Sequence, residues 1–279
     1  MDTIRSVDEM RGRARKLREG GSVVGLVPTM GYLHEGHLSL VRRARELSDA
    51  VVVSIFVNPT QFGPGEDLER YPRDLERDSR LAEEAGCDVL FVPTASGMYP
   101  EGHATVVHVE RLSERLCGAY RPGHFDGVCT VVAKLFNIVA PTLAVFGQKD
   151  GQQASIIERM VDDLDMGVRI ELVPTVREPD GLAMSSRNVY LSPEEREDAL
   201  SLNSALTRAK ASFEAGETDA RAVLQGVREE IDGRPTATVQ YAAAVDRRTL
   251  DDVDVLSPGT MIAVAVHVGA TRLIDNVVL

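Results

Sequence analysis

The chain of 279 residues is long enough for one large or two ordinary domains, and its 43% of apolar residues excludes global disorder. Its 43 acidic and 31 basic side chains give a net charge of −12, which argues against general nucleic-acid binding because that function needs a basic surface. The three cysteines lack CxxC spacing, so neither a disulfide framework nor a zinc site is indicated. No apolar run reaches membrane-spanning length and no signal-peptide core is present, so we expect a soluble cytoplasmic protein with no membrane partner.

Short apolar runs alternate with helical patterns through the first part of the chain. The N-terminal 20 residues read as a charged amphipathic helix, and a buried strand at 22–27 is followed by a helix from about residue 34. The further strands are expected at 50–57, 87–93, 142–147 and 169–176, and the further helices at 74–86 and 152–164. This alternation predicts a doubly wound, Rossmann-like parallel sheet with helices on both faces.

The pattern changes after about residue 176. Residues 192–232 read as two polar amphipathic helices, and the pair Ser192-Pro193 is a plausible start for the first of them. Two strand-like runs follow, at 237–245 and 260–268. We therefore expect two domains, a Rossmann-like domain at 1–176 and a smaller α+β lid domain at 177–279.

Polar motifs follow four of the predicted strands. They read PTMGYLHEGH, NPTQFG, QKDGQQ and REPDGLAMSSR, in chain order. Open α/β sheets bind ligands along the edge formed by the carboxyl ends of their strands. The four motifs together therefore predict a binding site at that edge.

The segment GYLHEGH has the glycine spacing of a phosphate-binding loop. His37 replaces the lysine of that motif and Leu38 replaces its hydroxyl residue, which excludes a true Walker A loop. A helix N-terminus still offers amides and a positive dipole end to an anion, and His34 and His37 share one helical face from which both can donate to phosphate. The alternative interpretation, two surface histidines near a helix start, is disfavoured by Pro28 and the two glycines.

The other motifs are less specific taken singly. Lys149 suits a point charge on a phosphate and Gln153 can bind a polar substrate, but Asp150 also fits an ordinary helix cap. Residues 183–188, AMSSRN, bring two hydroxyls and an arginine that could hold a triphosphate, unless they form only a serine-rich linker.

Two amides follow the second predicted strand. Asn58 and Gln61 could orient a small hydroxylated acid, although Asn-Pro is also common in turns.

Seven segments in order resemble the pantoate–β-alanine ligase family, from about residue 3 to the end of the chain. They are PTMGYLHEGH, FVNPTQFG, DLERYPR, RPGHFDGV, FGQKDGQQ, DGLAMSSRN and TRLIDN. HEGH alone indicates the wider HxGH nucleotidyltransferase superfamily, and AMSSR is similar to that superfamily's KMSKS-type signature. Gly151 departs from the family pattern, where alanine or an aromatic residue is expected.

The resemblance implies an AMP-forming acid–amino-acid ligase of pantothenate biosynthesis that works in two steps. The pantoate carboxylate attacks the α-phosphorus of MgATP, giving pantoyl adenylate and pyrophosphate, and the β-alanine amine then attacks the acyl carbon to give pantothenate and AMP. ATP and Mg²⁺ are the implied cofactors, and a homodimer built through the N-terminal domain is the implied assembly. No carboxylate cluster for Mg²⁺ is evident, so the metal ligands stay open, with Asp150 one possible contact.

The resemblance also assigns the site. The implied catalytic residues are His37, His34, Lys149 and Arg187. The implied ATP contacts are Met30, Gly31, Tyr32, Leu33, His34, Glu35, Gly36, His37, Gly147, Gln148, Lys149, Asp150, Val176, Met184, Ser185, Ser186 and Arg187. The implied substrate contacts are Gln61 for pantoate and β-alanine, Gln153 for pantoate, and Asn58, Arg121 and Tyr71.

Three alternatives remain at this point. A related nucleotidyltransferase that adenylates a phosphate monoester would call for extra basic residues near NPTQF, where this chain has amides. A nucleotide-binding regulatory protein would tolerate the loss of His37, Lys149 or Arg187, all of which are present. A dinucleotide-dependent oxidoreductase is disfavoured because no GxGxxG follows the first strand.

Overall fold

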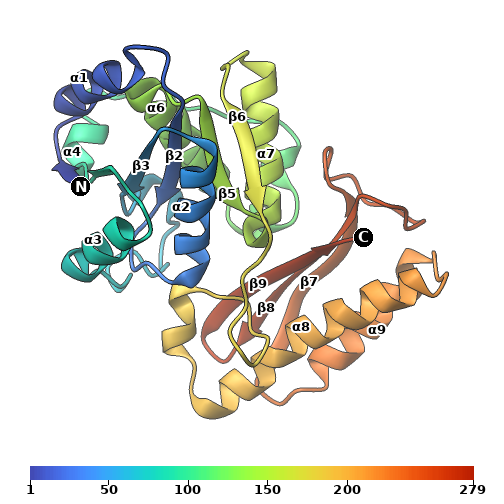
Figure 1. The fold of residues 1–279 in the computed structure, drawn as a ribbon. Coiled ribbons are helices and arrows are strands. Elements are labelled where there is room, and N and C mark those ends of the chain that lie inside the picture. Colours follow the sequence, from blue (N-terminus) through green and yellow to red (C-terminus); the bar gives the residue numbers. More distant parts are fainter. The chain divides into compact units, whose positions relative to one another are not determined.

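The computed structural model describes residues 1–279, and the chain divides into two compact units (Figure 1). The first unit comprises Met1–Glu114, Gly118–Gly147 and Ile156–Val173. The second comprises Arg115–Cys117, Gln148–Ser155 and Pro174–Leu279.

The first unit is built on a six-stranded sheet in which every pair of neighbours is parallel. Its strands lie in the order β1-β4-β3-β2-β5-β6. Their bounds are β1 Asp2–Ile4, β2 Val24–Thr29, β3 Ala50–Ile55, β4 Val89–Phe91, β5 Leu143–Gly147 and β6 Arg169–Val173. The doubly wound α/β prediction is confirmed, and β1 is an additional strand at the sheet's edge.

Helices cover both faces of this sheet. The bounds are α1 Val7–Arg18, α2 Glu35–Leu47, α3 Leu75–Glu84, α4 Ala95–Met98, α5 Cys117–Tyr120, α6 His124–Val139 and α7 Gly151–Asp163, with short 3₁₀ turns η1 Pro59–Gln61 and η2 Leu112–Glu114. The further 3₁₀ turns, η3 Gln148–Asp150 and η4 Ser186–Tyr190, belong to the second unit. Apolar residues of α2 and α3 pack with Val27 of β2 and with alternate residues of β3 and β5, as expected where successive strand residues point to opposite faces. Helices α1 and α6 pack together, and α6 also packs against β2.

The chain reverses its direction across the sheet next to β2. From β2 it proceeds through β3 to β4 on one side, and it then returns to place β5 and β6 on the other side. Strands β2 and β5 are therefore neighbours at the topological switch point, where ligands bind in open α/β sheets. The segments that follow β2 and β5 begin at Met30 and Gln148. These residues belong to the predicted site motifs PTMGYLHEGH and QKDGQQ.

The second unit is a three-stranded antiparallel sheet packed against two helices. The bounds are α8 Pro193–Glu214, α9 Ala220–Asp232, β7 Ala237–Asp246, β8 Thr260–Val268 and β9 Thr271–Val278. Helix α8 begins after Ser192 as predicted, because Ser192 and Glu195 each accept the other's backbone N–H in a capping box. Leucine, valine and alanine side chains from both helices and all three strands form its core.

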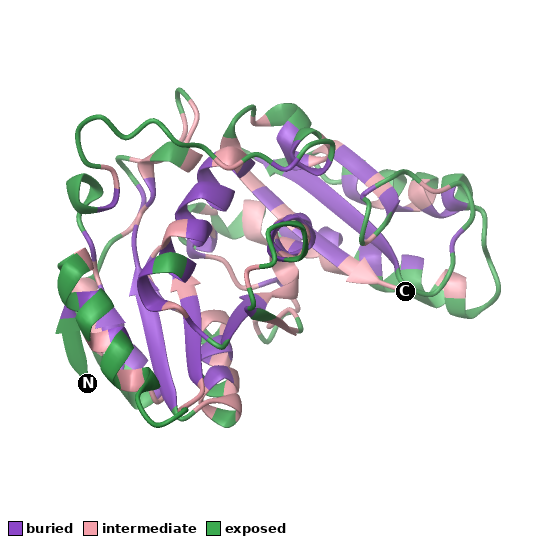
Figure 2. Cartoon of the chain, turned by 90° about the horizontal axis from the view of Figure 1, so that it is seen from above, coloured by how far each residue is buried: buried purple, intermediate pink, exposed green.

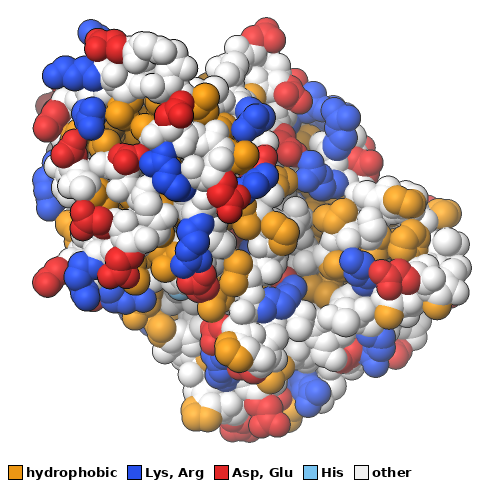
Figure 3. Space-filling view, in the orientation of Figure 1, with side chains coloured by type: hydrophobic (Ala, Val, Ile, Leu, Met, Phe, Trp, Pro, Cys, Tyr) orange, Lys and Arg blue, Asp and Glu red, His pale blue; other side chains and the backbone are white.

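Burial follows these elements. In Figure 2 most of the strands are largely buried, β1 at the N-terminus is exposed, and most other exposed residues lie on outward helix faces and loops. On the face drawn in Figure 3, Lys and Arg side chains are interspersed with Asp and Glu. None of the helices combines the length and the apolar character that crossing a bilayer requires.

Candidate active site

The turn after β2 is held by side-chain hydrogen bonds to its backbone. The hydroxyl of Thr29 donates to the carbonyl of Ser54 (2.7 Å) and accepts the amide of Gly31 (3.2 Å). Gly31 has φ +86°, and a Cβ there would lie 2.9 Å from Cγ2 of Ile55. Glycine is therefore required at this position by both backbone conformation and space.

A buried carboxylate fixes the next two residues of the turn. Asp78 on α3 is 1% exposed and accepts the amides of Tyr32 (2.6 Å) and Leu33 (2.7 Å). These bonds hold Tyr32 at φ 51°, in the left-handed region that non-glycine residues rarely adopt. Burial raises the pKa of Asp78, and the two backbone N–H bonds act in the opposite direction.

Sequence reasoning did not single out Asp78. Its signal lies in the spacing of α3, since Asp78 occupies the helical face that also carries the buried Ala82. An acidic residue on the apolar face of an amphipathic helix calls for a buried partner. The backbone amides of the histidine turn supply that partner.

His34 and His37 lie side by side at the start of α2. Their ring centroids are 4.0 Å apart, and the amide of His34 donates to Nδ1 of His37 (3.3 Å). Because Nδ1 of His37 accepts this bond, a neutral His37 ring carries its proton on Nε2. Glu35 and Gly36 follow as the first two helical residues, whose amides have no carbonyl partner within the helix.

The backbone amides of the turn before His34 differ from those of Glu35 and Gly36, because they already bind side-chain oxygens of the protein. The N–H groups of Gly31, Tyr32 and Leu33 are bound by Thr29 and Asp78. The helix start is thus the part of this motif whose backbone can bind an anion. The carboxylate of Glu35 is paired with Arg42, which lowers the pKa of Glu35.

Asn58 and Gln61 lie together after β3. Asn58 is 1% exposed, and its Nδ2 donates to Oε1 of Gln61 (3.0 Å) and to the carbonyl of Gly127 (3.1 Å). Its Oδ1 accepts the Tyr99 hydroxyl (2.8 Å) and the Thr60 hydroxyl (2.9 Å). The amide of Asn58 is thus occupied by protein partners, and in this structure it orients Gln61.

Arg121 is also engaged with protein groups. Its Nε donates to Oε1 of Glu66 (2.7 Å) and its Nη1 lies 3.1 Å from Nε2 of His124. Nδ1 of His124 lies 2.8 Å from the backbone carbonyl of Gln61. Since a carbonyl only accepts and a guanidinium only donates, a neutral His124 ring carries its proton on Nδ1.

Tyr71, the remaining predicted substrate contact of this unit, is buried at 4% exposure. Its ring packs edge-on against Phe62 at a centroid distance of 6.1 Å.

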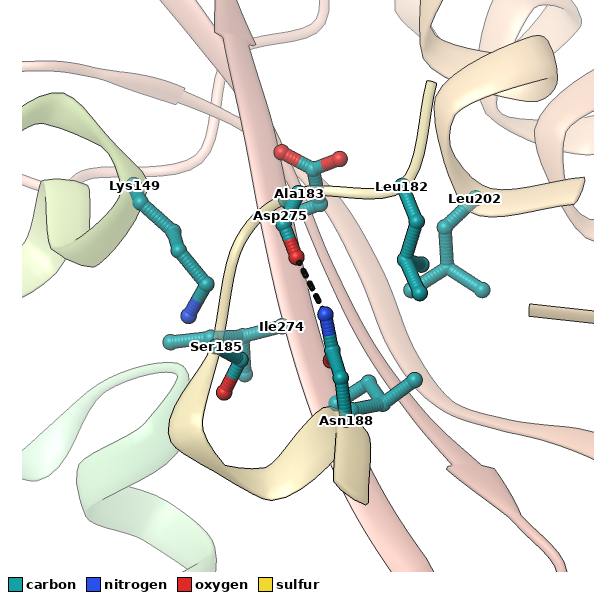
Figure 4. Close-up of a pocket in the computed structure, with 9 residues that line it drawn as sticks. Lys149, Leu182, Ala183, Ser185, Asn188, Leu202, Ile274 and Asp275 are labelled. Atoms are coloured by element: carbon teal, nitrogen blue, oxygen red, sulfur yellow. Dashed lines mark hydrogen bonds between the residues drawn. The ribbon is translucent and has the colours of Figure 1, made fainter. Parts of the chain in front are cut away.

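The second unit carries the other predicted site residues. Lys149 and Ser185 line one pocket with Asn188 and Asp275, and Lys149 extends from η3 toward the segment of Ser185 (Figure 4). Nδ2 of Asn188 donates to the carbonyl of Ala183 (3.1 Å, the dashed line in Figure 4) and to Glu178 (2.8 Å). The predicted lysine and the predicted AMSSR segment are therefore brought together.

Backbone bonds shape the AMSSR segment itself. The amide of Met184 donates to the carbonyl of Val176 (3.0 Å), and the amide of Arg187 donates to the hydroxyl of Ser185 (3.3 Å). Ser186 begins η4 and is buried. Gln153 is half-buried in the first turn of α7, after Asp150 at the end of η3.

The cysteines and the possible metal ligands form no reactive centre of their own. All three cysteines are buried thiols, and burial raises the pKa of Cys87 and of Cys129 to about 12. No group of three or more His, Cys, Asp and Glu side chains is arranged to hold a metal ion.

Comparison with known proteins places this arrangement in a family. The model of the pantoate-beta-alanine ligase family matches residues 2–278. The pantothenate synthetase of Heliobacterium modesticaldum is 58% identical over 100% of this chain and 99% of that protein. That of Pelotomaculum thermopropionicum is 56% identical over 98% of this chain and 97% of that protein.

Solved structures agree with these relatives. The crystal structure of pantothenate synthetase from Thermus thermophilus has a TM-score of 0.94 and 49% identity, covering 99% of both chains. A pantoate-beta-alanine ligase from Francisella tularensis, complexed with beta-gamma ATP and beta-alanine, has a TM-score of 0.84 and 33% identity over 100% of this chain and 97% of that one. The chain belongs to the pantoate–β-alanine ligase family.

Proposed function

We propose that this chain condenses (R)-pantoate with β-alanine at the expense of ATP, through a pantoyl adenylate, giving pantothenate, AMP and pyrophosphate. The observation that carries the proposal is the family match over residues 2–278. The ligands of the Francisella tularensis complex, beta-gamma ATP and beta-alanine, fit the same reaction. The alternative, adenylation of a phosphate monoester, has no support from these relatives.

The segment that follows β2 carries the proposed hydrogen-bond donors for the phosphates. We assign this role to Nε2–H of His37, to His34, and to the amides of Glu35 and Gly36 at the start of α2. A helix N-terminus favours negative charge, and donors fixed in place before the reaction stabilise charge that develops in the transition state. The hydrogen bonds within the turn of 29–34 hold these donors in position.

The turn η3 and the segment Met184–Arg187 carry the proposed cations and hydroxyls. We assign Lys149 and Arg187 to the charge that builds on the leaving pyrophosphate, with Ser185 and Ser186 as neutral donors. Met184 and Val176, which are joined by a backbone hydrogen bond, are proposed as further nucleotide contacts.

Substrate recognition is assigned to uncharged side chains. Gln61 is our proposed contact for pantoate and β-alanine, and Gln153 for pantoate. Asn58 and Arg121 are given supporting roles, since their polar groups bind Gln61, Glu66 and His124. The pantoate carboxylate is itself the nucleophile, so no reactive thiol is needed, in line with the raised pKa of the Cys87 and Cys129 thiols.

Magnesium is proposed to enter as part of the substrate MgATP. Mg²⁺ keeps several waters and is commonly held by substrate phosphates together with few protein ligands. The cytoplasmic location and the homodimer stay predictions of the sequence analysis.

The decisive experiment is ATP–pyrophosphate exchange. Labelled pyrophosphate should enter ATP when pantoate is present and β-alanine absent, because adenylate formation is reversible and precedes the amine. Adding β-alanine should give AMP, pyrophosphate and pantothenate in equal amounts. Release of ADP, or exchange that proceeds equally well without pantoate, would contradict the proposal.

A further inference from the structure

We propose that the dipeptide Asp275-Asn276 on β9 is a positioning element. It holds Lys149 and the Met184–Arg187 segment in the positions that the proposed reaction requires. The motif TRLIDN contains this dipeptide, and the reaction assigns it no chemical role. The inference rests on the proposed function for the roles of Lys149 and Arg187.

Asn276 forms hydrogen bonds to the backbone of η3, the turn that carries Lys149. Its Nδ2 donates to the carbonyls of Gln148 and Lys149, both at 2.9 Å, and its Oδ1 accepts Nε2 of Gln148 at 3.0 Å. Asn276 is 6% exposed, so these bonds are shielded from water. Because both carbonyls can only accept, the orientation of the Asn276 amide is determined.

Gly151 shows how closely α7 approaches this asparagine. A Cβ at Gly151 would lie 2.6 Å from Sδ of Met261 and 3.1 Å from Nδ2 of Asn276. Position 151 is where the family resemblance leads to an expectation of alanine or an aromatic residue. In this chain, glycine leaves room at this position for the side chains of Met261 and Asn276.

Asp275 binds Arg177, which lies in the segment that leads to Met184. It is 3% exposed and accepts Nη1 (2.6 Å) and Nη2 (3.2 Å) of Arg177. Nη1 of Arg177 also donates to the carbonyl of Gly181 (3.3 Å), and Arg177 forms a backbone bridge with Ala183. The hairpin that leads into Met184 is thereby tied to β9.

The two residues act from adjacent positions on one strand. Successive strand side chains point in opposite directions, so the dipeptide can reach both segments at once. Asp275 also lines the pocket of Lys149 and Ser185 (Figure 4). The bonds of both side chains run to protein groups, so the dipeptide acts through Lys149 and Arg187 and not on the substrate.

The primary test is Asn276→Asp, which keeps the size and the acceptor for Gln148 but sets a carboxylate oxygen against two carbonyls. We expect pantoate-dependent pyrophosphate exchange to fall tenfold or more. In a Lys149→Ala background the same change should lower the rate less than threefold further, because residues that act through one another are not additive. An Asn276→Asp rate within twofold of the parent, or independent multiplication of the two losses, would overturn the proposal.

Asp275→Asn provides the second arm, with Arg187→Ala as its background. We expect the same pattern, a loss of tenfold or more alone and less than threefold in the Arg187→Ala background. Independent multiplication of the Asp275→Asn and Arg187→Ala losses would contradict this arm of the proposal.

The control for stability is Ile231→Val, a change in the core of the same unit. It should keep exchange within twofold of the parent, and a comparable loss of activity in this variant would assign the Asn276→Asp effect to general destabilisation. Calorimetry separates the inference from the proposed function, because it needs no reaction. Asn276→Asp should weaken MgATP binding tenfold or more and adenosine binding less than twofold, and equal weakening of both would refute positioning at the phosphates.

Discussion

At the scale of single residues, Asp78 explains how the histidine turn keeps its shape. One buried carboxylate accepts two successive amides, of Tyr32 and Leu33, and so holds a left-handed residue directly before Leu33 and His34. The folded state must bury this charge, and the raised pKa of Asp78 reflects that cost. We infer that Asp78 positions the phosphate-binding residues without touching the substrate.

Asp78→Asn tests this role while preserving size. One amide oxygen can replace one of the two acceptors, but the new NH₂ group then faces a backbone N–H. We expect the KM for ATP to rise and exchange to fall roughly tenfold, since an unsatisfied buried donor costs about 1–3 kcal/mol. Asp74→Asn is the matched control, because Asp74 only caps α3 and asparagine caps equally well. Equal losses in both variants would argue against a special role for Asp78.

His37→Ala tests the phosphate donor itself. A single preorganised donor contributes about 10²–10³ in rate, so we expect turnover to fall by about that factor while the thermal midpoint changes little. Lys149→Ala and Arg187→Ala should behave alike. His267→Ala, at an exposed position on β8, is the control and should keep the parent rate. Near-normal turnover of His37→Ala would contradict the assignment.

The reactivity of the buried cysteine thiols measures how well the folded interior excludes solvent and reagents. Burial raises the pKa of Cys87 and Cys129 to about 12, so in the folded chain their reactive thiolates form only in strongly alkaline solution. We expect these two thiols to react with a disulfide reagent at pH 8 at least about a hundredfold more slowly in the folded chain than in guanidinium. Peptide mapping identifies the labelled residue. Rapid labelling of Cys87 or Cys129 in the folded chain would show that the interior is open.

At the scale of elements, the start of α6 and the turn η1 form one substructure. A Cβ at Gly127 would lie 2.4 Å from the carbonyl of Thr60, so the helix and the turn are in direct backbone contact. His124 and Asn58 then bind the backbone carbonyl and the side chain of Gln61. The position of the proposed substrate contact is therefore set by a helix far from it in sequence.

His124→Ala should weaken substrate recognition selectively. Loss of the donor to the Gln61 carbonyl removes one neutral hydrogen bond, and we expect the KM values for pantoate and β-alanine to rise roughly twofold to tenfold. The KM for ATP should stay close to that of the parent. Asn137→Ala, near the other end of α6, is the control. An equal rise in all three KM values would indicate general disruption.

At the scale of the whole molecule, the family resemblance predicts a homodimer built through the N-terminal domain. Sedimentation velocity at micromolar concentration should show a species of twice the chain mass of 30.4 kDa. Dilution should reveal the dissociation constant as the monomer appears. A monomer at every concentration would remove this prediction.

The predicted strands at the sheet's centre and the amphipathic helices were found, whereas α6, β1 and β9 were not anticipated, nor were the one-turn helices α4 and α5. Helix α6 is buried along almost its whole length, so its sequence lacks the polar face that marks an amphipathic helix. β1 is only three residues long, and β9 carries charged and amide residues at Arg272, Asp275 and Asn276. The polar side chains of β9 are hydrogen-bonded through tertiary contacts, which periodicity in the sequence does not reveal.

The sequence by itself determined the doubly wound class and the order of the motifs after the strands, because alternating strand and helix patterns and strand-end polarity are local. The family resemblance rested on the seven motifs. Tertiary structure decided which amides of the histidine turn are already bound, that Asn58 and Arg121 face protein partners, and that Asp275 and Asn276 tie down two distant segments. Each of these depends on contacts between residues far apart in the chain, such as Tyr32 with Asp78 or Lys149 with Asn276. Hydrogen bonds of that kind are fixed by packing, and no spacing rule along the chain encodes them.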